Sequence, residues 1–523
     1  MKRILHEHPA WLVMLAVFAA LAPMAFMRDF SAANELRYLS IADEAIASGH
    51  FFVMSDQGVP YADKPPLYLW LVMLCRLIAG KHSMPLLCML AFLPACVIVD
   101  TMDRWLCKAL PGRFSLRERL GAATMLATSG LFLELCFFIR MDTLMAMFIV
   151  LALYAFREEK PWAFAIFTFL AVFTKGLAGL IPVFTVLVLC LVQRQGRRLR
   201  HFIGWRFLVV ALAGCLFWFG GIWFEGGTPY LRNLLVHQTY GRVVQAFDHQ
   251  QPWWFFLPVI WEVISPYSLL AIPAVVASFL RPDKRTEDER ILAIAMVAGF
   301  MLMSLSKSKL PIYLVPLIPF AVYTVPLVLK RSSWRPWWQW GLIIPAFLGI
   351  LLGLGTVAIA LRLVRIPAFD AYGFIYHPAV VAGGLLLAGG SLAALLLARR
   401  EWPRSVFCLA GGMLALQFTI CLFLMRDLNP YVGYRDFCSK IPEDAKIYTA
   451  RVYRPSSIDV YLGRDVTRDY GRDYDELAAE IPDDGILVIR DKALQESPSL
   501  AEALAPYTPY AQSGVFLLYD LRR

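Results

Sequence analysis

Twelve ionisable side chains of this sequence are placed where a membrane protein could do chemistry. They lie at the ends of long apolar segments or in the loops between them: Glu35, Arg37, Asp63, Lys64, Asp142, Lys175, His237, Arg242, Asp248, His249, Lys307 and Lys309. A charge near hydrocarbon is costly unless it is used or paired, so this concentration indicates a functional site. Lysine and arginine can hold a lipid phosphate while a carboxylate handles an attacking group. For any single lysine, the alternative is that it only extends to lipid head groups.

Membrane-spanning helices must position these residues. Of the 523 residues, 59% are hydrophobic and 17% are charged, whereas soluble domains are about 45–50% apolar and about 25% charged. The apolar stretches are continuous rather than alternating, which excludes a strand barrel, and each can cross a hydrocarbon core of about 30 Å. We predict an all-α polytopic membrane protein with about thirteen transmembrane helices. Their limits are near 10–27, 84–107, 120–139, 143–157, 161–174, 176–193, 206–224, 254–280, 291–306, 311–329, 338–361, 377–398 and 405–425.

The net charge of +10 is unevenly distributed along the chain. Residues 427–523 hold 12 Lys and Arg against 17 Asp and Glu, so this tail carries −5 and the rest of the chain +15. The basic excess lies in alternate connections between apolar segments, such as 104–119 and 194–206, and such clusters mark the cytoplasmic side. An odd number of spans then places the tail in the periplasm of a bacterium, outside its inner membrane. This distribution gives no reason to expect nucleic acid as a partner.

Two regions are neither spans nor short loops. The segment 28–82 is mixed in polarity, and its apolar residues at helical spacing predict amphipathic helices on the outer membrane surface. Lys64-Pro65-Pro66 is expected to start one of them. The tail alternates β-rich runs with helical stretches, at 446–449, 474–481, 485–489, 498–504 and 515–519. We therefore predict a transmembrane catalytic domain over residues 1–426 and a small periplasmic α/β domain over residues 427–523.

Six short motifs follow one another along the chain. They are Asn34-Glu35-Leu36-Arg37-Tyr38, Tyr61-Ala62-Asp63-Lys64-Pro65-Pro66, Arg140-Met141-Asp142, Thr174-Lys175-Gly176, His249-Gln250-Gln251-Pro252-Trp253-Trp254 and Ser306-Lys307-Ser308-Lys309-Leu310-Pro311-Ile312-Tyr313. In this order they resemble the polyprenyl-phosphate-sugar-dependent glycosyltransferases of the GT-C fold. The chain is most similar to the bacterial aminoarabinose transferases that modify lipid A, which are related to protein O-mannosyltransferases. The resemblance covers roughly residues 10–330.

The resemblance implies a catalytic carboxylate in the first outer loop, where the family has an Asp-Glu pair and this chain has Asn34-Glu35. An amide cannot accept a proton, so Asn34 can orient a substrate but cannot serve as a general base. Three explanations stay open: Glu35 takes over, the acceptor is already ionised as a phosphate would be, or the chain has reduced activity. A salt bridge with Arg37 or a neighbour is the structural alternative for Glu35. Asp142 matches a further acidic residue of the family's site, and a helix cap is its alternative.

The family's carboxylate-Lys-Pro motif corresponds to Asp63-Lys64-Pro65 and implies that Lys64 contacts the carrier phosphate. Carrier or substrate binding is also implied for Arg37, Tyr38, Arg242, Lys307, Lys309 and Tyr313. A metal site is implied for Asp63 with His237 or His249, although Asp is one methylene shorter than the family's usual Glu. We expect no tightly bound cofactor and leave a divalent cation open. The ten cysteines show no CxxC spacing and predict structural thiols.

The sequence thus predicts an inverting glycosyltransferase that takes a sugar from an undecaprenyl-phosphate-type carrier. The expected acceptor is lipid A, another glycan or a protein on the periplasmic side, and membrane lipids surround the protein. No GxxxxGK[ST] or GxGxxG motif predicts a nucleotide site. One alternative is a multi-pass lipid or sugar transporter, or flippase, which would need polar residues in mid-span. Another is a degenerate, non-catalytic homologue, which Asn34 suggests.

Overall fold

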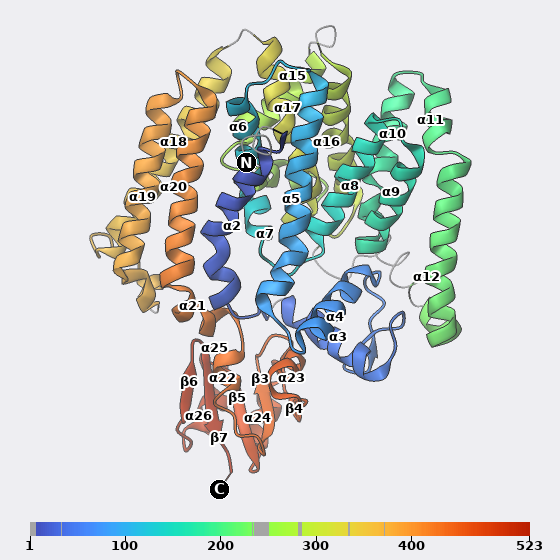
Figure 1. Ribbon diagram of the computed structural model, residues 1–523. Helices are drawn as coiled ribbons and strands as arrows, with labels where there is room; N and C mark the ends of the chain where they lie inside the picture. Colours follow the sequence, from blue (N-terminus) through green and yellow to red (C-terminus); the bar gives the residue numbers. More distant parts are fainter. Residues whose placement is uncertain are drawn as a thin grey trace.

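The computed structural model describes residues 7–32, 34–232, 234, 250–280, 285–332, 335–370 and 372–522. Most of these residues are helical (Figure 1). Eight stretches of the described residues are long and apolar enough to cross a membrane, so the protein is a multi-pass membrane protein. These stretches are Ala10–Met27, Met84–Ala109, Pro161–Val192, Gly196–Arg232, Pro311–Arg331, Pro336–Ala360, Pro378–Leu397 and Trp402–Phe423.

The helical part is built from long helices and from helices that are interrupted. In chain order it comprises α2 (Ala10–Met27), α5 (Met84–Ala109), α6 (Leu116–Ala127), α7 (Gly130–Leu135), α8 (Asp142–Arg157), α9 (Pro161–Lys175), η1 (Gly176–Leu180), α10 (Ile181–Val192), α11 (Gly196–Phe202), α12 (Trp205–Arg232), α14 (Phe256–Val263), α15 (Ser268–Leu280), α16 (Glu287–Leu305), η4 (Pro311–Leu317), α17 (Ile318–Arg331), α18 (Arg335–Ala360), α19 (Pro378–Leu397) and α20 (Trp402–Phe423). The short 3-10 turns η5 (Pro367–Phe369) and η6 (Gly373–Tyr376) lie between α18 and α19. The predicted span 120–139 is divided between α6 and α7, and the predicted span 254–280 between α14 and α15.

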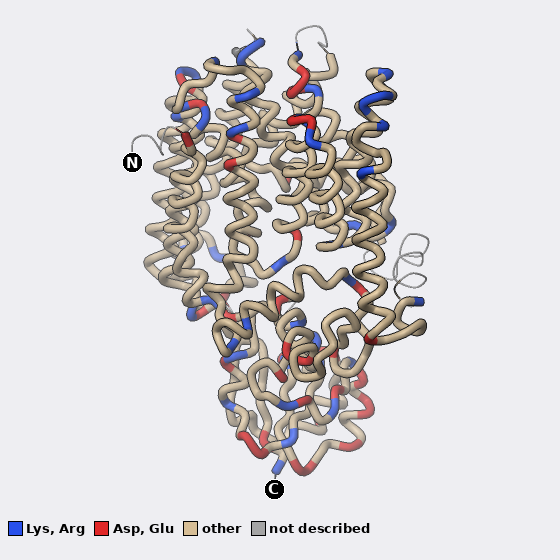
Figure 2. The backbone as a smooth tube through the Cα atoms, turned by 45° about the vertical axis from the view of Figure 1, so that its right-hand side comes forward, with Lys and Arg blue, Asp and Glu red and all other residues tan. Residues whose placement is uncertain are grey.

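One end of the helical part carries a group of shorter elements. It holds α3 (Glu35–Ser48), the hairpin β1 (Ser55–Asp56) and β2 (Val59–Pro60), and α4 (Leu67–Ala79). We call this end the α3–α4 face. The connections α5–α6 and α10–α11 lie at the opposite end (Figure 1). Lys and Arg lie at that opposite end together with some Asp and Glu, and further Lys and Arg lie in the C-terminal part of the chain (Figure 2).

The helices α3 and α4 agree with the prediction for segment 28–82. α3 is amphipathic, buries Leu36, Leu39 and Ile41, and ends at Gly49 in the left-handed conformation, a common helix C-terminus. α4 begins directly after Pro65-Pro66, as expected for prolines at a helix start. The short hairpin between the two helices was not predicted.

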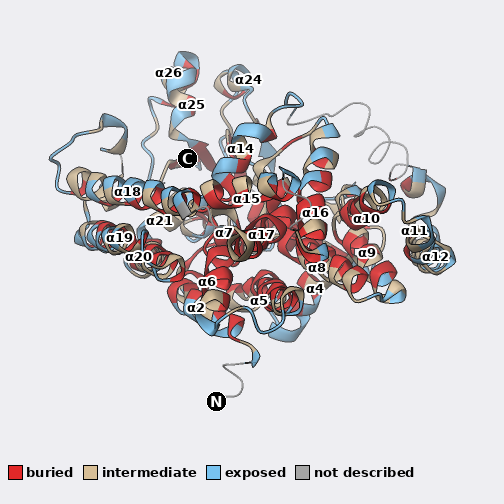
Figure 3. Cartoon of the chain, turned by 90° about the horizontal axis from the view of Figure 1, so that it is seen from above, coloured by how far each residue is buried: buried red, intermediate tan, exposed pale blue. Residues whose placement is uncertain are grey.

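Buried side chains concentrate in the middle of the molecule, around α5, α6, α7, α8 and α17, while α12, α18 and α19 lie at the edge (Figure 3). The edge helices expose large apolar side chains such as Leu216 and Phe224. In water such exposure would be costly, whereas lipid tails are as apolar as the side chains they meet. The exposed faces therefore fit a hydrocarbon surrounding.

Residues 425–522, here called the C-terminal segment, contain a five-stranded sheet with the strand order β4-β3-β5-β7-β6. β3 (Lys446–Ala450) is parallel to β4 (Arg468–Asp469) and β5 (Gly485–Arg490), and β7 (Phe516–Asp520) is antiparallel to β5 and β6 (Ala511–Ser513). Its helices are α21 (Met425–Val432), α22 (Arg435–Cys438), α23 (Asp459–Leu462) after the short turn η7 (Pro455–Ile458), α24 (Tyr474–Ala479), α25 (Asp491–Glu496) and α26 (Pro498–Leu504).

Asp29, just after α2, joins the helical part to the C-terminal segment. Its carboxylate is 2% exposed and accepts hydrogen bonds from the Tyr461 hydroxyl at 2.5 Å and the Arg435 backbone N–H at 2.9 Å. Its own backbone N–H donates to the Asn429 side chain at 2.8 Å. Gly433 packs so closely that a Cβ there would lie 2.1 Å from Asp29 Oδ2. Asp29 thus fixes the end of α2 against the C-terminal segment, and α3 follows this joint in the chain.

Candidate active site

Glu35, the first residue of α3, is 1% exposed. Arg28 donates hydrogen bonds to both of its oxygens, at 2.5 Å to Oε2 and 2.8 Å to Oε1. The backbone N–H groups of Ser31 and Ile139 donate to the same oxygens at 2.7 and 2.8 Å. Because four donors satisfy this carboxylate, the geometry favours a structural role over the predicted role as a base. The ion-pair partner is Arg28 and not Arg37.

An ion-paired centre lies where α8 begins and α9 ends. Asp142 is 1% exposed, and its Oδ1 accepts a hydrogen bond from Lys175 Nζ. Arg140 Nε lies 3.4 Å from the other oxygen, Oδ2. The Lys175 ammonium also lies 4.8 Å from the centre of the Tyr313 ring. The structure therefore brings the predicted residues Asp142 and Tyr313 together. Lys175 lies between them, and Arg140 lies beside Asp142.

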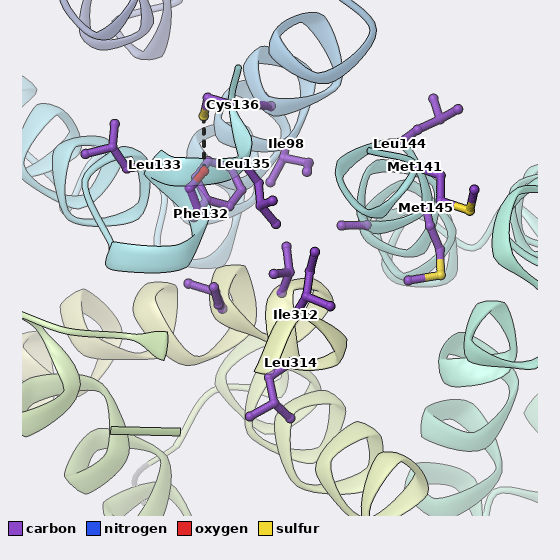
Figure 4. Close-up of a cluster of buried hydrophobic side chains, with 14 of the residues drawn as sticks. Ile98, Phe132, Leu133, Leu135, Cys136, Met141, Leu144, Met145, Ile312 and Leu314 are labelled. Atoms are coloured by element: carbon purple, nitrogen blue, oxygen red, sulfur yellow. Dashed lines mark hydrogen bonds between the residues drawn. The ribbon is translucent and has the colours of Figure 1, made fainter. Parts of the chain in front are cut away.

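The packing beneath this centre holds its parts in place. α8 and α9 form an antiparallel pair joined by the short connection 158–160, so the start of one lies beside the end of the other. A buried cluster contains Met141, which directly precedes α8, and Met145 of α8 together with Ile312 and Leu314 of η4 (Figure 4). Close-packed apolar contacts of this kind fix backbone positions. The cluster thereby fixes Asp142 against Tyr313.

Tyr38 of α3 lies beside the ion-paired centre. Its ring meets the ring of Tyr68 from α4 edge-on, with centroids 5.7 Å apart. Burial raises the pKa of Tyr38 to about 12. The charge on Asp142 also raises this pKa, while the charges on Arg140, Arg37 and Arg454 lower it. The Tyr68 hydroxyl is fully buried and has no hydrogen-bond partner among the described residues.

Arg37 connects α3 to the hairpin and to the loop before α4. Its Nε donates to Asp56 Oδ2 at 2.9 Å, and its Nη1 lies 3.7 Å from Asp63 Oδ2. The guanidinium also lies over the Tyr61 ring, 4.5 Å from its centre. Two carboxylates thus neutralise Arg37, and a cation already lies at Asp63, the residue predicted as a metal ligand.

Lys64 lines a pocket between the loop before α4 and the outer part of α12. The pocket is lined by Phe52, Met54, Tyr61, Lys64, Pro66, Trp218, Ile222, Tyr230 and Leu234. The Tyr230 hydroxyl donates to the Tyr61 carbonyl at 2.7 Å, which ties α12 to the loop. The pocket has a volume of about 10 Å³, which is room for about one water molecule. Lys64 is the cation among its aromatic and aliphatic walls, and the Asp142 centre contributes none of the residues that line it.

Lys309 is 3% exposed, and its ammonium donates to the carbonyls of Gln251, at 3.1 Å, and Ser306. Burial lowers the pKa of this lysine. For Lys309 the alternative of reaching lipid head groups is wrong, because its ammonium points into the protein. Lys307 is held through its backbone instead, because its carbonyl accepts a hydrogen bond from the Gln251 N–H at 3.2 Å.

Four of the twelve candidate residues, His237, Arg242, Asp248 and His249, lie outside the described residues. No group of three or more His, Cys, Asp or Glu side chains within the described ranges is positioned to hold a metal ion. Asn34 precedes α3, is half-buried and makes no cap hydrogen bond with its side chain. Asp63 is the one described residue of the implied metal site, and its carboxylate faces Arg37.

The sequence interpretation missed three residues that shape the site. Arg28 was not considered as the partner of Glu35, and Tyr68 was not selected although it follows Lys64 by four residues. Glu225 of α12 accepts hydrogen bonds from the backbone N–H groups of Phe51, Phe52 and Val53 at 3.1, 2.7 and 2.9 Å. Glu225 thereby holds the loop that forms one wall of the Lys64 pocket. The sequence did contain a signal for Glu225, because it is a lone acidic residue directly after the apolar run 206–224.

Comparisons with known proteins show which proteins the chain as a whole resembles. No protein-family model matches the chain. The undecaprenyl phosphate-alpha-4-amino-4-deoxy-L-arabinose arabinosyl transferase 1 of Pseudomonas fluorescens is 26% identical over 320 residues, which is 58% of this chain and 54% of that protein. The transferase of the same kind from Pseudomonas savastanoi pv. phaseolicola is 27% identical over 338 residues, 61% of each chain. The matched part thus spans little more than half the length of these relatives.

Solved structures extend the likeness to the whole chain. The crystal structure of ArnT from Cupriavidus metallidurans bound to undecaprenyl phosphate superposes with a TM-score of 0.74, at 20% identity, and covers 98% of both chains. The Archaeoglobus fulgidus oligosaccharyltransferase in the apo form gives a TM-score of 0.50 at 14% identity, over 98% of this chain and 74% of that one. The resemblance to the GT-C aminoarabinose transferases is confirmed, and the fold is that of ArnT.

Proposed function

We propose that this protein is an inverting glycosyltransferase that takes a sugar from an undecaprenyl-phosphate-type carrier at the α3–α4 face. The observation that carries the proposal is the Asp142 centre, in which a buried carboxylate, two cations and Tyr313 meet at one end of a membrane bundle. The likeness to named undecaprenyl phosphate aminoarabinosyl transferases supports the same chemistry. The proposed sugar class is therefore an aminoarabinose.

The proposal includes an orientation and a division of the chain. The chain crosses the bacterial inner membrane about thirteen times, with the α3–α4 face in the periplasm. Residues 1–426 are the catalytic membrane domain, and residues 427–523 are a periplasmic α/β domain. The basic residues at the opposite end support this orientation (Figure 2).

Neutralisation of phosphate charge is the main task of the proposed mechanism. As the glycosidic bond breaks, the carrier phosphate leaves as an anion, and cations placed where this charge develops lower the barrier. Lys64 in its aromatic pocket is proposed to hold the carrier phosphate. Lys175 and Arg140 are proposed to keep the region around Asp142 electropositive, while Tyr313 and Tyr38 orient the sugar. Arg242 and Lys307 are retained as proposed carrier contacts.

The described carboxylates of the site are already paired with cations, and this pairing affects which class of acceptor the site can use. Glu35 is held by Arg28, and Asp142 by Lys175. Asn34 offers no proton-accepting group. An acceptor whose attacking oxygen is already ionised, such as a glycolipid phosphate, needs no base, so we propose this class ahead of a hydroxyl of a glycan or protein. Within this class of acceptors, we propose lipid A.

No tightly bound cofactor is part of the proposal. A divalent cation at Asp63 would compete with Arg37 for this carboxylate. Transfer assays with EDTA and with added divalent cations decide whether Asp63 and the predicted histidines His237 and His249 take part. Activity that is lost in EDTA and restored by one cation would establish a metal site there.

The test is sugar transfer by the purified full-length protein in vesicles that contain undecaprenyl-phosphate aminoarabinose and lipid A. Lys64→Ala and Asp142→Asn should each lower transfer at least a hundredfold, since each removes a charge at the reacting end. Arg365→Gln, in an exposed ion pair with Asp370, is the matched control and should leave transfer unchanged. Full activity of both site variants would refute the assignment. Movement of the carrier across the bilayer without transfer would support a flippase.

Asn34→Asp separates the explanations of the missing aspartate. Faster transfer by this variant would mean that a hydroxyl acceptor lacks its base. Unchanged transfer supports an ionised acceptor. No transfer by either the variant or the unsubstituted protein, with folding intact, would support a degenerate homologue.

A further inference from the structure

We propose that a groove at the end opposite the α3–α4 face is a binding site for an anionic phospholipid. The groove lies between the start of α6, the start of α18 and the connection from α19 to α20, and it has a volume of about 760 Å³. We call it the α6–α20 groove. Its volume falls within the range of about 300–1,000 Å³ that is usual for small-molecule sites.

Contacts between elements that are far apart in the chain hold the walls of this groove. Arg117 of α6 donates to Glu401 Oε2 at 3.0 Å, which joins the start of α6 to the residue before α20. α6 and α20 also touch directly, since a Cβ at Gly121 would lie 2.9 Å from the Trp402 ring. Gln339 of α18 donates to a backbone carbonyl of the α19–α20 connection at 3.2 Å. The packing of three elements therefore defines the groove.

The charges at the groove favour an anion. Six charged side chains line it or pair with those that do, namely Arg117, Glu118, Lys330, Arg400, Glu401 and Arg404. Four are basic and two are acidic, so two positive charges are in excess. Glu401 is shared by Arg117 and Arg404, each at 3.0 Å. The exposed Arg400 side chain makes no hydrogen bond or ion pair within the described part of the chain, and guanidinium groups bind phosphate oxygens through parallel N–H donors.

The polarity of the walls changes with depth. α6, α18 and α20 all begin at the groove, so residues later in each helix lie further from its charged end. Leu120 follows Arg117 on α6, and Phe407 lies about 7 Å beyond Trp402 on α20. Trp338 and Trp402 line the groove near the helix starts, and tryptophan collects where water meets hydrocarbon. Charged, amphipathic and apolar walls thus follow one another in the order of the groups in a phospholipid.

The surroundings select a lipid of the bulk membrane. α18 lies at the edge of the molecule (Figure 3), where exposed apolar side chains fit hydrocarbon, so an acyl chain can continue from the groove along this helix. A soluble phosphate would leave the apolar walls without a partner. The carrier is assigned to the Lys64 pocket, which shares no residue with the groove. A zwitterionic head group would bring its own cation toward the excess positive charge, so a head group of net negative charge fits best.

Native mass spectrometry of the full-length protein tests the site, with phosphatidylglycerol and phosphatidylcholine of identical acyl chains as probes. The first phosphatidylglycerol should bind at least tenfold more tightly than phosphatidylcholine. Arg400→Met should weaken this binding about tenfold to a hundredfold, the effect of losing a charge-assisted contact, and Arg400→Lys should recover part of the loss. A photoactivatable phosphatidylglycerol should label peptides that contain residues 115–120 and 400–407, and Arg400→Met should reduce this labelling.

Arg399→Met is the matched control, because Arg399 is the exposed arginine next to Arg400 and does not line the groove. It should change binding less than twofold. Equal affinities for the two lipids, equal effects of the two Met variants, or labelling confined to other peptides would overturn the inference, because this end would then attract anionic lipids only in general. Displacement of phosphatidylglycerol by undecaprenyl phosphate would also overturn it, since the groove would then serve the carrier. None of these outcomes depends on sugar transfer, so the groove and the proposed function are tested independently.

Discussion

Glu35→Gln would leave the Arg28 guanidinium buried without its counter-charge. The two side chains are 3% and 1% exposed, and glutamine has nearly the volume of glutamate, so a cavity contributes little. Breaking a buried ion pair by removing one partner costs about 3–5 kcal/mol. Taking about 4 kcal/mol, the folding equilibrium should shift by roughly a thousandfold. The loss should be comparable for Arg28→Met, which strands the carboxylate instead.

The double variant Arg28→Met with Glu35→Gln should recover most of this loss. It removes both charges and keeps an amide oxygen for the Ile139 N–H, and buried pairs replaced as a unit are often nearly neutral. The two single effects should therefore be strongly non-additive, by about 3 kcal/mol. The measurement is unfolding of the full-length protein in mixed micelles, followed by tryptophan fluorescence. Asp370→Asn breaks an exposed pair with Arg365 and should cost no more than about 1 kcal/mol.

Transfer measured per folded molecule completes this test. The double variant should retain activity within about threefold of the parent, because it preserves the start of α3 while removing no reacting group. A Glu35→Gln protein that is as stable as the parent but inactive would refute the structural role. Glu35 would then be the base that the resemblance implied.

Burial raises the pKa of Asp459 to about 6, so the folded protein holds this proton at pH values where the unfolded chain, at about 3.9, has released it. Stability from this group is therefore lost as pH rises from about 4 to about 6, and Asp459→Asn should stabilise by up to about 3 kcal/mol above pH 6 and by little below pH 4; a stability difference that does not depend on pH would exclude this origin. Gly179→Ala should destabilise by about 1–3 kcal/mol or prevent folding, because a Cβ there would lie 2.2 Å from the Val172 backbone nitrogen; Gly389→Ala, which meets nothing within 4 Å, is its control in thermal unfolding. Glu225→Ala should speed hydrogen exchange at the three amides of residues 51–53 at least tenfold, since it removes their acceptor; unchanged exchange would mean that other contacts hold this loop.

Local patterns predicted the elements around the site. The amphipathic spacing of α3, the prolines before α4 and the β-rich runs of the C-terminal segment each depend on neighbours in the chain. The pairing of Asp142 with Lys175 was also accessible in principle. α8 and α9 have nearly equal lengths and a connection of only three residues, so their outer ends must lie at the same height.

The partners of Glu35 and Ser40 could not be predicted in this way. Arg28 lies outside α3, at the end of another helix, so helical spacing favoured Arg37 as the partner of Glu35. In the structure Arg37 instead turns toward the hairpin and pairs with Asp56. Ser40 of α3 meets Asp459 only because the C-terminal segment docks on α3. Contacts of such sequence separation depend on tertiary packing, which periodicity does not encode.

The joint at Asp29 has a consequence for biosynthesis. The carboxylate is among the first buried groups to leave the ribosome, yet two of its donors, the Arg435 backbone N–H and the Tyr461 hydroxyl, follow about four hundred residues later. Until these are translated, a charged group destined for the interior has only the hydrogen bond from the neighbouring Phe30 N–H, and the outer end of α2 stays exposed to water. A nascent chain that stops after α20 would thus carry all the candidate membrane spans of the described residues and still present an unfinished surface, which quality-control proteases recognise as unfolded.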